Sequence, residues 1–198
     1  GPSEVMVLAD NSARAEFVAA DLLSQAEHGD DSQAILVCRT ERFARQVTRA
    51  VEEQIRYLSR GEAIRNSLAN SRIVLFDEEY KQIAFANAYA PEHLIVSMRD
   101  AWGIAAKITA AGSVFIGNYS PESAGDYASG TNHTLPTGGW ARACSGVNVD
   151  SFMRKITFQE LTRDGLDALA PAITAMAEAE GLDAHANAVR VRMKGGIL

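Results

Sequence analysis

The sequence predicts an α/β protein: a parallel sheet flanked by helices, followed by a C-terminal helical arm. Short apolar runs alternate with longer amphipathic segments, which is the pattern of βαβ units. The clearest apolar run, residues 34–38, is continuous, as expected for a strand covered on both faces. The alternation stops after residue 117. We therefore expect an α/β domain over residues 1–146 and a helical arm over 147–198.

The first 120 or so residues supply the strands and the helices between them. Strands are expected at residues 5–9, 34–38, 72–76, 94–96 and 113–117. Helices are expected at residues 10–28, 41–59, 62–68, 78–88 and 100–110. Asp10, Asn11 or Ser12 would cap the first helix, and Asp100 the last. A sheet built from only these strands is expected to expose an edge.

The second part of the chain has a different character. Residues 121–139 are rich in glycine and proline, and a loop of this length in a compact domain is usually functional or disordered. Residues 145–162 look irregular, with a possible strand at 156–158. Helices are expected at 166–180 and 183–192, separated by Gly181.

Composition excludes several classes of protein. The net charge of −6, without a basic stripe, argues against a nucleic-acid partner. No apolar run is long enough to span a membrane, and no signal peptide is recognisable. The two cysteines are too few for a disulfide framework, so a reduced, cytoplasmic setting fits. Cys38 is expected in the core, and Cys144 is interpreted as a packing residue rather than a nucleophile.

A carboxylate and an imidazole stand side by side at Glu92 and His93. Pro91 disfavours helix at Ala90, so the pair is expected at a helix-to-strand junction. A histidine near neutral pH and an adjacent carboxylate offer general acid–base chemistry. In an extended segment the two side chains would point to opposite faces unless the junction turns them together. The alternative is a surface glutamate beside a half-buried histidine.

A metal site is the second chemical possibility. The four histidines all have polar or acidic neighbours, and Gln25 and His28 share one face of a predicted helix. Together with Asp126 and His185 they would supply enough donors for zinc. Their spacing matches no short zinc motif, so capping or surface histidines remain the alternative. No glycine-rich dinucleotide or phosphate-binding motif is present.

Several long segments resemble the histidinol dehydrogenase family. They are residues 1–5 (GPSEV), 21–29 (DLLSQAEHG), 90–94 (APEHL), 112–117 (GSVFIG), 125–137 (GDYASGTNHTLPT), 158–161 (FQEL) and 177–185 (AEAEGLDAH). The resemblance covers essentially the whole chain. It implies a Rossmann-like parallel sheet and oxidation of L-histidinol to L-histidine, the last step of histidine biosynthesis, through a bound aldehyde. It also implies two hydride transfers to NAD, with zinc as the metal.

The resemblance also implies roles for individual residues. His93 matches the general base, and Glu92 the residue that activates water for the second oxidation. The implied zinc ligands, which also contact substrate, are Gln25, His28, Asp126 and His185. Further implied substrate contacts are Ser3, His133 and Glu180, besides His93. The family is a domain-swapped homodimer, so the arm would donate Glu180 and His185 across the interface.

One departure from the family is its length, since the family's chain is about twice as long. The resemblance therefore implies that an N-terminal half is missing, with part of the sheet and the NAD contacts. It also favours Gly1-Pro2 as native sequence rather than a cloning scar, and the chain alone is expected to be inactive. Two other interpretations stay open: a related dehydrogenase of another amino or polar alcohol, and a non-catalytic zinc-binding fragment.

Overall fold

A computed structural model describes residues 2–193 of the chain. The expectation for Gly1 lies outside the described residues. The chain forms two compact units, Gly1–Phe152 and Met153–Leu198, each of which is described by itself. No helix within residues 2–193 is long and apolar enough to cross a membrane.

The first unit is built on a five-stranded, fully parallel sheet, as predicted. The strand order is β3-β2-β1-β4-β5. The bounds are β1 Glu4–Ala9, β2 Gln33–Cys38, β3 Arg72–Leu75, β4 His93–Ser97 and β5 Ser113–Ile116. In the parallel register of β1, β4 and β5, Val5 lies opposite His93, and His93 lies opposite Ser113. The first residues of β1, β4 and β5 therefore meet at one edge of the sheet.

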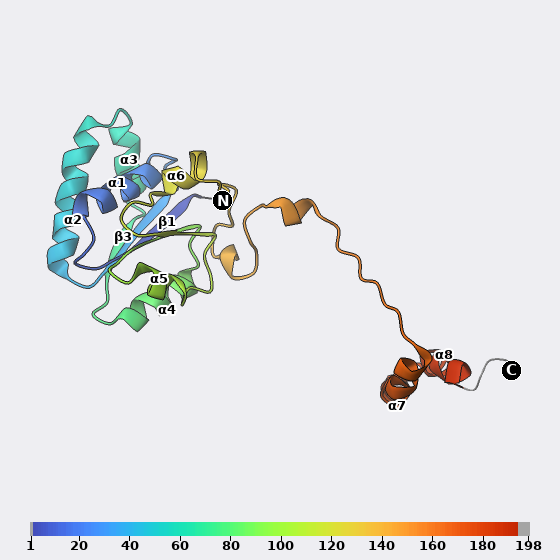
Figure 1. Cartoon of the computed structure of the whole chain (residues 1–198). Coiled ribbons are helices and arrows are strands. Elements are labelled where there is room, and N and C mark those ends of the chain that lie inside the picture. Colours follow the sequence, from blue (N-terminus) through green and yellow to red (C-terminus); the bar gives the residue numbers. More distant parts are fainter. Residues whose placement is uncertain (1, 194–198) are drawn as a thin grey trace. The chain divides into compact units, whose positions relative to one another are not determined.

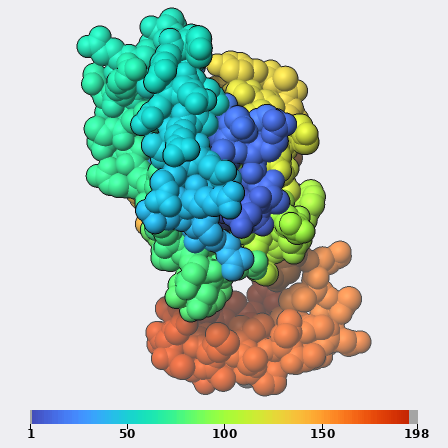
Figure 2. Space-filling view, turned by 90° about the vertical axis from the view of Figure 1, so that its left-hand side faces the viewer, coloured from blue at the N-terminus to red at the C-terminus, as the bar shows by residue number. Residues whose placement is uncertain are grey.

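Helices cover both faces of this sheet (Figure 1). One face carries α1 (Ala15–Ala26), α2 (Glu41–Gln54), the 3₁₀ turn η1 (Ile55–Tyr57) and α3 (Gly61–Leu68). Figure 2 shows α2 and α3 with the blue α1 segment beside them. The other face carries α4 (Glu79–Tyr89) and α5 (Ala101–Ala105). Every residue of β1 is buried between the two layers, which explains why its sequence is almost entirely apolar.

Three helices differ from the prediction. The first begins at Ala15 rather than directly after a cap at residues 10–12, because Asp10 accepts hydrogen bonds from both the backbone N–H and the hydroxyl of Ser12 and so forms a turn instead of a cap. The helix capped by Asp100 ends at Ala105, so the prediction that it reaches residue 110 was wrong. A six-residue helix, α6 (Glu122–Tyr127), occupies part of the predicted glycine-rich loop.

The remaining predictions for the first unit are close to the observed bounds, and the sheet does end in an exposed strand. The edge strand β3 leaves Ile73 and Leu75 almost half exposed. After α6, the chain of this unit holds only the 3₁₀ turns η2 (Trp140–Arg142) and η3 (Val149–Phe152). Cys38 is buried as expected, whereas Cys144 is exposed, so its interpretation as a packing residue was wrong.

The second unit is a helical hairpin. It consists of α7 (Arg163–Ala179) and α8 (Asp183–Met193), preceded by a segment without regular structure. The possible strand at 156–158 does not form. Thr162 caps α7, and Gly181 makes the turn with φ of +71°. Ala177, Ala186 and Val189 form its small buried contact. Its assignment as a dimerisation arm stays a prediction.

Candidate active site

The candidate site lies at the amino ends of three neighbouring strands. Glu4, His93 and Ser113 are the first residues of β1, β4 and β5, and Ser3 and Glu92 directly precede β1 and β4. In open α/β sheets ligands ordinarily bind at the carboxyl ends of the strands. The site therefore uses the opposite edge, which is why no glycine-rich turn after a strand marks it in the sequence.

The turn between α4 and β4 brings Glu92 and His93 together. Ala90 adopts the left-handed conformation with φ of 57° at the end of α4, and Pro91 leads into the strand. The carboxylate oxygen Oε2 of Glu92 lies 3.6 Å from Nδ1 of His93. The two residues are only 6% and 5% exposed. The alternative of a surface glutamate beside a half-buried histidine is therefore wrong.

The main chain of Glu4 holds both members of this pair. Its N–H donates to Oε2 of Glu92 over 2.9 Å. Its carbonyl oxygen lies 3.1 Å from Nδ1 of His93. Because a carbonyl oxygen only accepts, Nδ1 carries the hydrogen, and the lone pair of the neutral imidazole is on Nε2. This nitrogen is buried, and no described protein group is within hydrogen-bonding distance of it.

A pocket of about 420 Å³ lies beside the pair. Its lining consists of Ser3, His28, Glu92, His93, Asp126, Tyr127 and His133. Asp126 reaches it from α6, with Oδ1 3.7 Å from Nε2 of His93. A Cβ atom at Gly125 would lie 2.5 Å from the Phe115 ring, so glycine is required for α6 to pack this close to β5. The structure thus brings six predicted site residues of the first unit to one pocket: Ser3, His28, Glu92, His93, Asp126 and His133.

Burial shifts the pKa values of the pair toward their neutral forms. Burial, together with the negative charges of Glu4 and Asp126, raises the pKa of Glu92 to about 7, against the lowering effect of the Glu4 N–H. Burial also lowers the pKa of His93, more than the carboxylate of Asp126 can raise it. At neutral pH His93 is therefore a neutral base.

Donors for a metal lie on this side of the unit, although they do not form a complete cluster. Among residues 2–193, no group of three or more His, Cys, Asp or Glu side chains is close enough to hold an ion. Gln25 is fully buried, and neither atom of its amide has a hydrogen-bond partner in the described part of the chain. An unpaired buried amide is costly, so this side chain is suited to binding a ligand. With the imidazole of His28 and the carboxylate of Asp126, the donor types suit zinc.

Two predicted site residues belong to the second unit. Glu180 follows α7, and His185 lies in the first turn of α8. Both side chains are exposed. They are available for a role in a site outside their own unit, and that role stays a prediction.

Comparison with known proteins shows to which family the chain belongs. The profile of the family described as Histidinol dehydrogenase matches residues 1–193. The chain is 58% identical to a histidinol dehydrogenase of Bacteroides fragilis over 194 residues, and 52% identical to one of Aliivibrio fischeri. The crystal structure of histidinol dehydrogenase from Elizabethkingia anophelis superposes with a TM-score of 0.93 at 56% identity.

This chain belongs to the histidinol dehydrogenase family. The matches to the Bacteroides fragilis and Elizabethkingia proteins cover 98% of this chain but only 45% of each of those longer chains. This chain therefore corresponds to the C-terminal half of the family's chain, as the sequence predicted.

Sequence reasoning missed the burial of Glu122 and the partial burial of Asp21, two carboxyl groups on the side of the unit that carries Asp126. Glu122 in α6 is 1% exposed, and neither carboxyl oxygen has a hydrogen-bond partner among the described residues. Burial, together with the charges of Asp126 and Asp21, raises its pKa to about 8. Burial also raises the pKa of Asp21 to about 7. Nothing in the sequence signals this burial, because residues 121–139 look like a loop.

Glu122→Gln is expected to stabilise the chain at neutral pH. The folded-state pKa of about 8 exceeds the ordinary 4.5, so between these values the folded state binds more protons and the free energy of unfolding falls as pH rises. In the variant the free energy of unfolding should no longer fall in this way as pH rises. At pH 7 it should exceed that of the parent by on the order of 3 kcal/mol. Urea unfolding at pH 5 and pH 8 measures the free energy of unfolding of both proteins. Glu16→Gln, an exposed glutamate on α1, should keep the slope, and an unchanged slope in Glu122→Gln would contradict the expectation.

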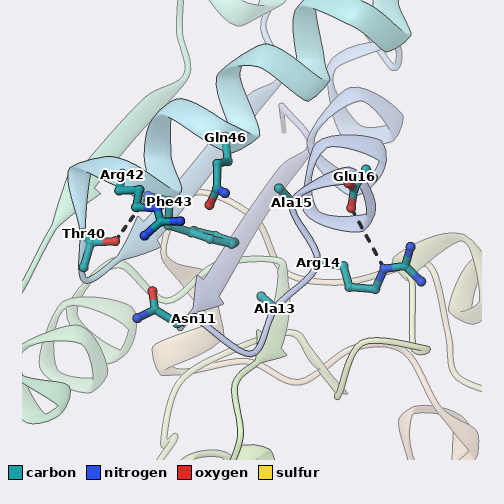
Figure 3. Close-up of a pocket in the computed structure, with 9 residues that line it drawn as sticks. All are labelled: Asn11, Ala13, Arg14, Ala15, Glu16, Thr40, Arg42, Phe43 and Gln46. Carbon is teal, nitrogen blue, oxygen red and sulfur yellow. Dashed lines mark hydrogen bonds and ion pairs between the residues drawn. The ribbon is translucent and has the colours of Figure 1, made fainter.

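A second pocket, of about 600 Å³, lies at the opposite edge of the sheet (Figure 3). It sits beyond the carboxyl ends of β1 and β2, between the starts of α1 and α2. The Thr40 hydroxyl caps α2 by accepting from the Phe43 N–H, and Arg14 pairs with Glu16. This is the edge where α/β sheets ordinarily bind ligands, and none of the predicted site residues lies there.

Proposed function

We propose that this chain is the C-terminal half of a zinc-dependent, NAD-linked histidinol dehydrogenase that oxidises L-histidinol to L-histidine in the cytoplasm. The observation that carries the proposal is the buried Glu92–His93 pair, held by the main chain of Glu4 with the free lone pair of the imidazole on Nε2. Membership of the family supports the choice of substrate.

His93 supports the first oxidation. Converting the primary alcohol to an aldehyde removes a hydride from carbon and a proton from oxygen. Neutral His93 can accept the proton on Nε2, and the Nδ1 hydrogen bond to Glu4 holds the ring in the required tautomer. Asp126, 3.7 Å from Nε2, then stabilises the imidazolium that forms.

Glu92 supports the second oxidation. The aldehyde must first be hydrated, and a carboxylate can accept a proton from the water as it adds to the carbonyl carbon. The hydrate then loses a hydride from carbon and a proton from oxygen, which leaves the carboxylic acid. The burial of Glu92 makes it a stronger base than an exposed glutamate, because its pKa is near 7.

The remaining residues would bind the metal and the substrate. When bound, zinc would hold nitrogen atoms of the substrate, and NAD would accept one hydride in each oxidation. Gln25, His28 and Asp126 would hold zinc together with His185, and Ser3, His133 and Glu180 would contact the substrate. Glu180 and His185 would come from the arm of the other subunit in a domain-swapped homodimer. The NAD contacts would lie in the N-terminal half of the enzyme.

The pH dependence of the aldehyde step should report Glu92. Only the ionised carboxylate can accept a proton, so the rate should rise with pH around a midpoint near 7. His93 is neutral around this midpoint, because its pKa is lowered from the ordinary 6.5. The measurement is single-turnover oxidation of histidinal from pH 5 to pH 9. A midpoint below pH 5 would contradict the assignment.

A substrate panel tests the proposed function. The protein would be a full-length histidinol dehydrogenase in which this chain forms the C-terminal half, called the full-length enzyme below. NADH formation should be fastest with L-histidinol. A faster rate with another amino or polar alcohol would support the related-dehydrogenase alternative. Zinc binding without NADH formation from any alcohol would support a non-catalytic zinc-binding protein.

A further inference from the structure

The side chain of Glu4 makes a contact that the chemistry above does not use. Glu4 is 6% exposed at the start of β1. Its Oε1 atom accepts a hydrogen bond of 2.8 Å from the N–H of Gly138, a residue 134 positions later in the chain. Its Oε2 atom is buried and has no hydrogen-bond partner among the described residues. A buried carboxylate at this position is costly and therefore calls for an explanation.

The contact ties a glycine-rich loop to the sheet. Residues 128–139, called the glycine-rich loop below, connect α6 to η2 and form no helix or strand of their own. The other hydrogen bonds of this loop in the described chain run within the loop, back to α6, or to residues 140–147. Glu4 is thus the residue of the sheet to which the loop is hydrogen-bonded, within the part that the structure describes.

The loop matters because it carries His133 into the pocket. His133 lines the pocket together with Glu92 and His93, and its side chain is exposed. Gly138 and Gly139 have positive φ values of 61° and 77°, so the backbone at the anchor adopts a conformation that glycine favours. Leu135 and Pro136 also pack against Gly112 at the start of β5, where a Cβ atom would lie 2.5 Å from the carbonyl oxygen of Glu92.

We propose that Glu4 is a positioning residue that couples the glycine-rich loop to the catalytic pair. Its N–H orients Glu92, its carbonyl oxygen orients His93, and its carboxylate holds the loop through Gly138. One residue thereby fixes both sides of the pocket relative to each other. The inference deepens the proposed function and rests on it, because the pocket is taken to hold the substrate.

The three contacts come from different parts of Glu4, so substitution separates them. Any residue at position 4 except proline keeps the main-chain contacts to Glu92 and His93. Alanine removes the contact to Gly138 and the negative charge near Glu92, whereas glutamine removes the same charge but keeps an oxygen that can accept from Gly138. The effect of Glu4→Ala should therefore fall on the loop and on substrate binding more than on the chemical step.

The test compares Glu4→Ala, Glu4→Gln and a control in the full-length enzyme. The control is Asn87→Ala, which removes three side-chain hydrogen bonds to residues 107–110 and leaves the loop untouched. Hydrogen–deuterium exchange of peptides containing Gly138 reports the loop, and steady-state kinetics with L-histidinol report the site. If Glu4→Ala does not fold, Glu4→Asp, whose carboxylate is one methylene shorter, takes its place.

In Glu4→Ala, exchange at Gly138 should be about 10- to 100-fold faster, the range expected for loss of one hydrogen bond to a charged group. The KM for L-histidinol should rise about tenfold, with little change in kcat. Glu4→Gln and Asn87→Ala should stay close to the parent enzyme in both measurements. Unchanged exchange in Glu4→Ala, or equal acceleration in Asn87→Ala, would overturn the proposal. The exchange measurement does not require turnover, so an enzyme inactive toward L-histidinol would refute the proposed function without deciding the role of Glu4 in holding the loop.

Discussion

Replacing His93 by alanine is expected to lower NADH formation from L-histidinol by about 10²- to 10⁴-fold, the usual contribution of a general base. His93 is the buried imidazole whose Nε2 lone pair is free, and alanine leaves no group there to accept the hydroxyl proton. Zinc content should not change, because the proposed ligands are other residues. The measurements are the steady-state rate and the metal content of the purified full-length enzyme.

A second histidine of the same pocket supplies the control for His93→Ala. His28 lines the pocket and is proposed as a zinc ligand. His28→Ala should therefore lose zinc together with turnover, whereas His93→Ala should lose turnover alone. Loss of zinc from His93→Ala to the same extent as from His28→Ala would contradict the assignment of His93 as the base.

The second large effect is expected from Glu92→Gln, which should stop the reaction at the aldehyde. Glutamine keeps an oxygen that accepts the Glu4 N–H, so the turn into β4 should hold its shape. It cannot take a proton from water, and oxidation of histidinal should fall by about 10²-fold or more. Oxidation of the alcohol should be affected much less, because His93 is unchanged. Product analysis should find histidinal in place of L-histidine.

An exposed glutamate provides the matched control for this substitution. Glu16→Gln makes the same chemical change on α1, where the side chain is largely exposed. That variant should still convert L-histidinol fully to L-histidine. Equal loss of the alcohol and aldehyde steps in Glu92→Gln would show that Glu92 is needed for the site as a whole and not specifically for the addition of water.

The sheet was predictable from the sequence because its strands are buried. The apolar runs that become β1, β2 and β4 are bounded by turn residues, and both faces of these strands are covered. The short helix α6 was not predictable, because six residues that include Gly125 carry no helical periodicity. It forms where the missing side chain of Gly125 lets the helix pack against the Phe115 ring, a long-range contact that the local sequence does not encode.

The candidate site was predictable in part. The adjacency of Glu92 and His93 was visible, but their turn toward each other depends on the left-handed conformation of Ala90. The role of Glu4 follows only from the register that places the start of β1 beside the start of β4. The resemblance supplied the zinc and substrate residues, and four of those in the first unit do meet in one pocket: Ser3, His28, Asp126 and His133.

The most direct test of the proposed function is the stoichiometry of the reaction in the full-length enzyme. Limiting L-histidinol should yield two NADH and one L-histidine per molecule consumed, because His93 and Glu92 are proposed to serve two successive oxidations in one pocket. One NADH per L-histidinol, with histidinal as the final product, would contradict the account.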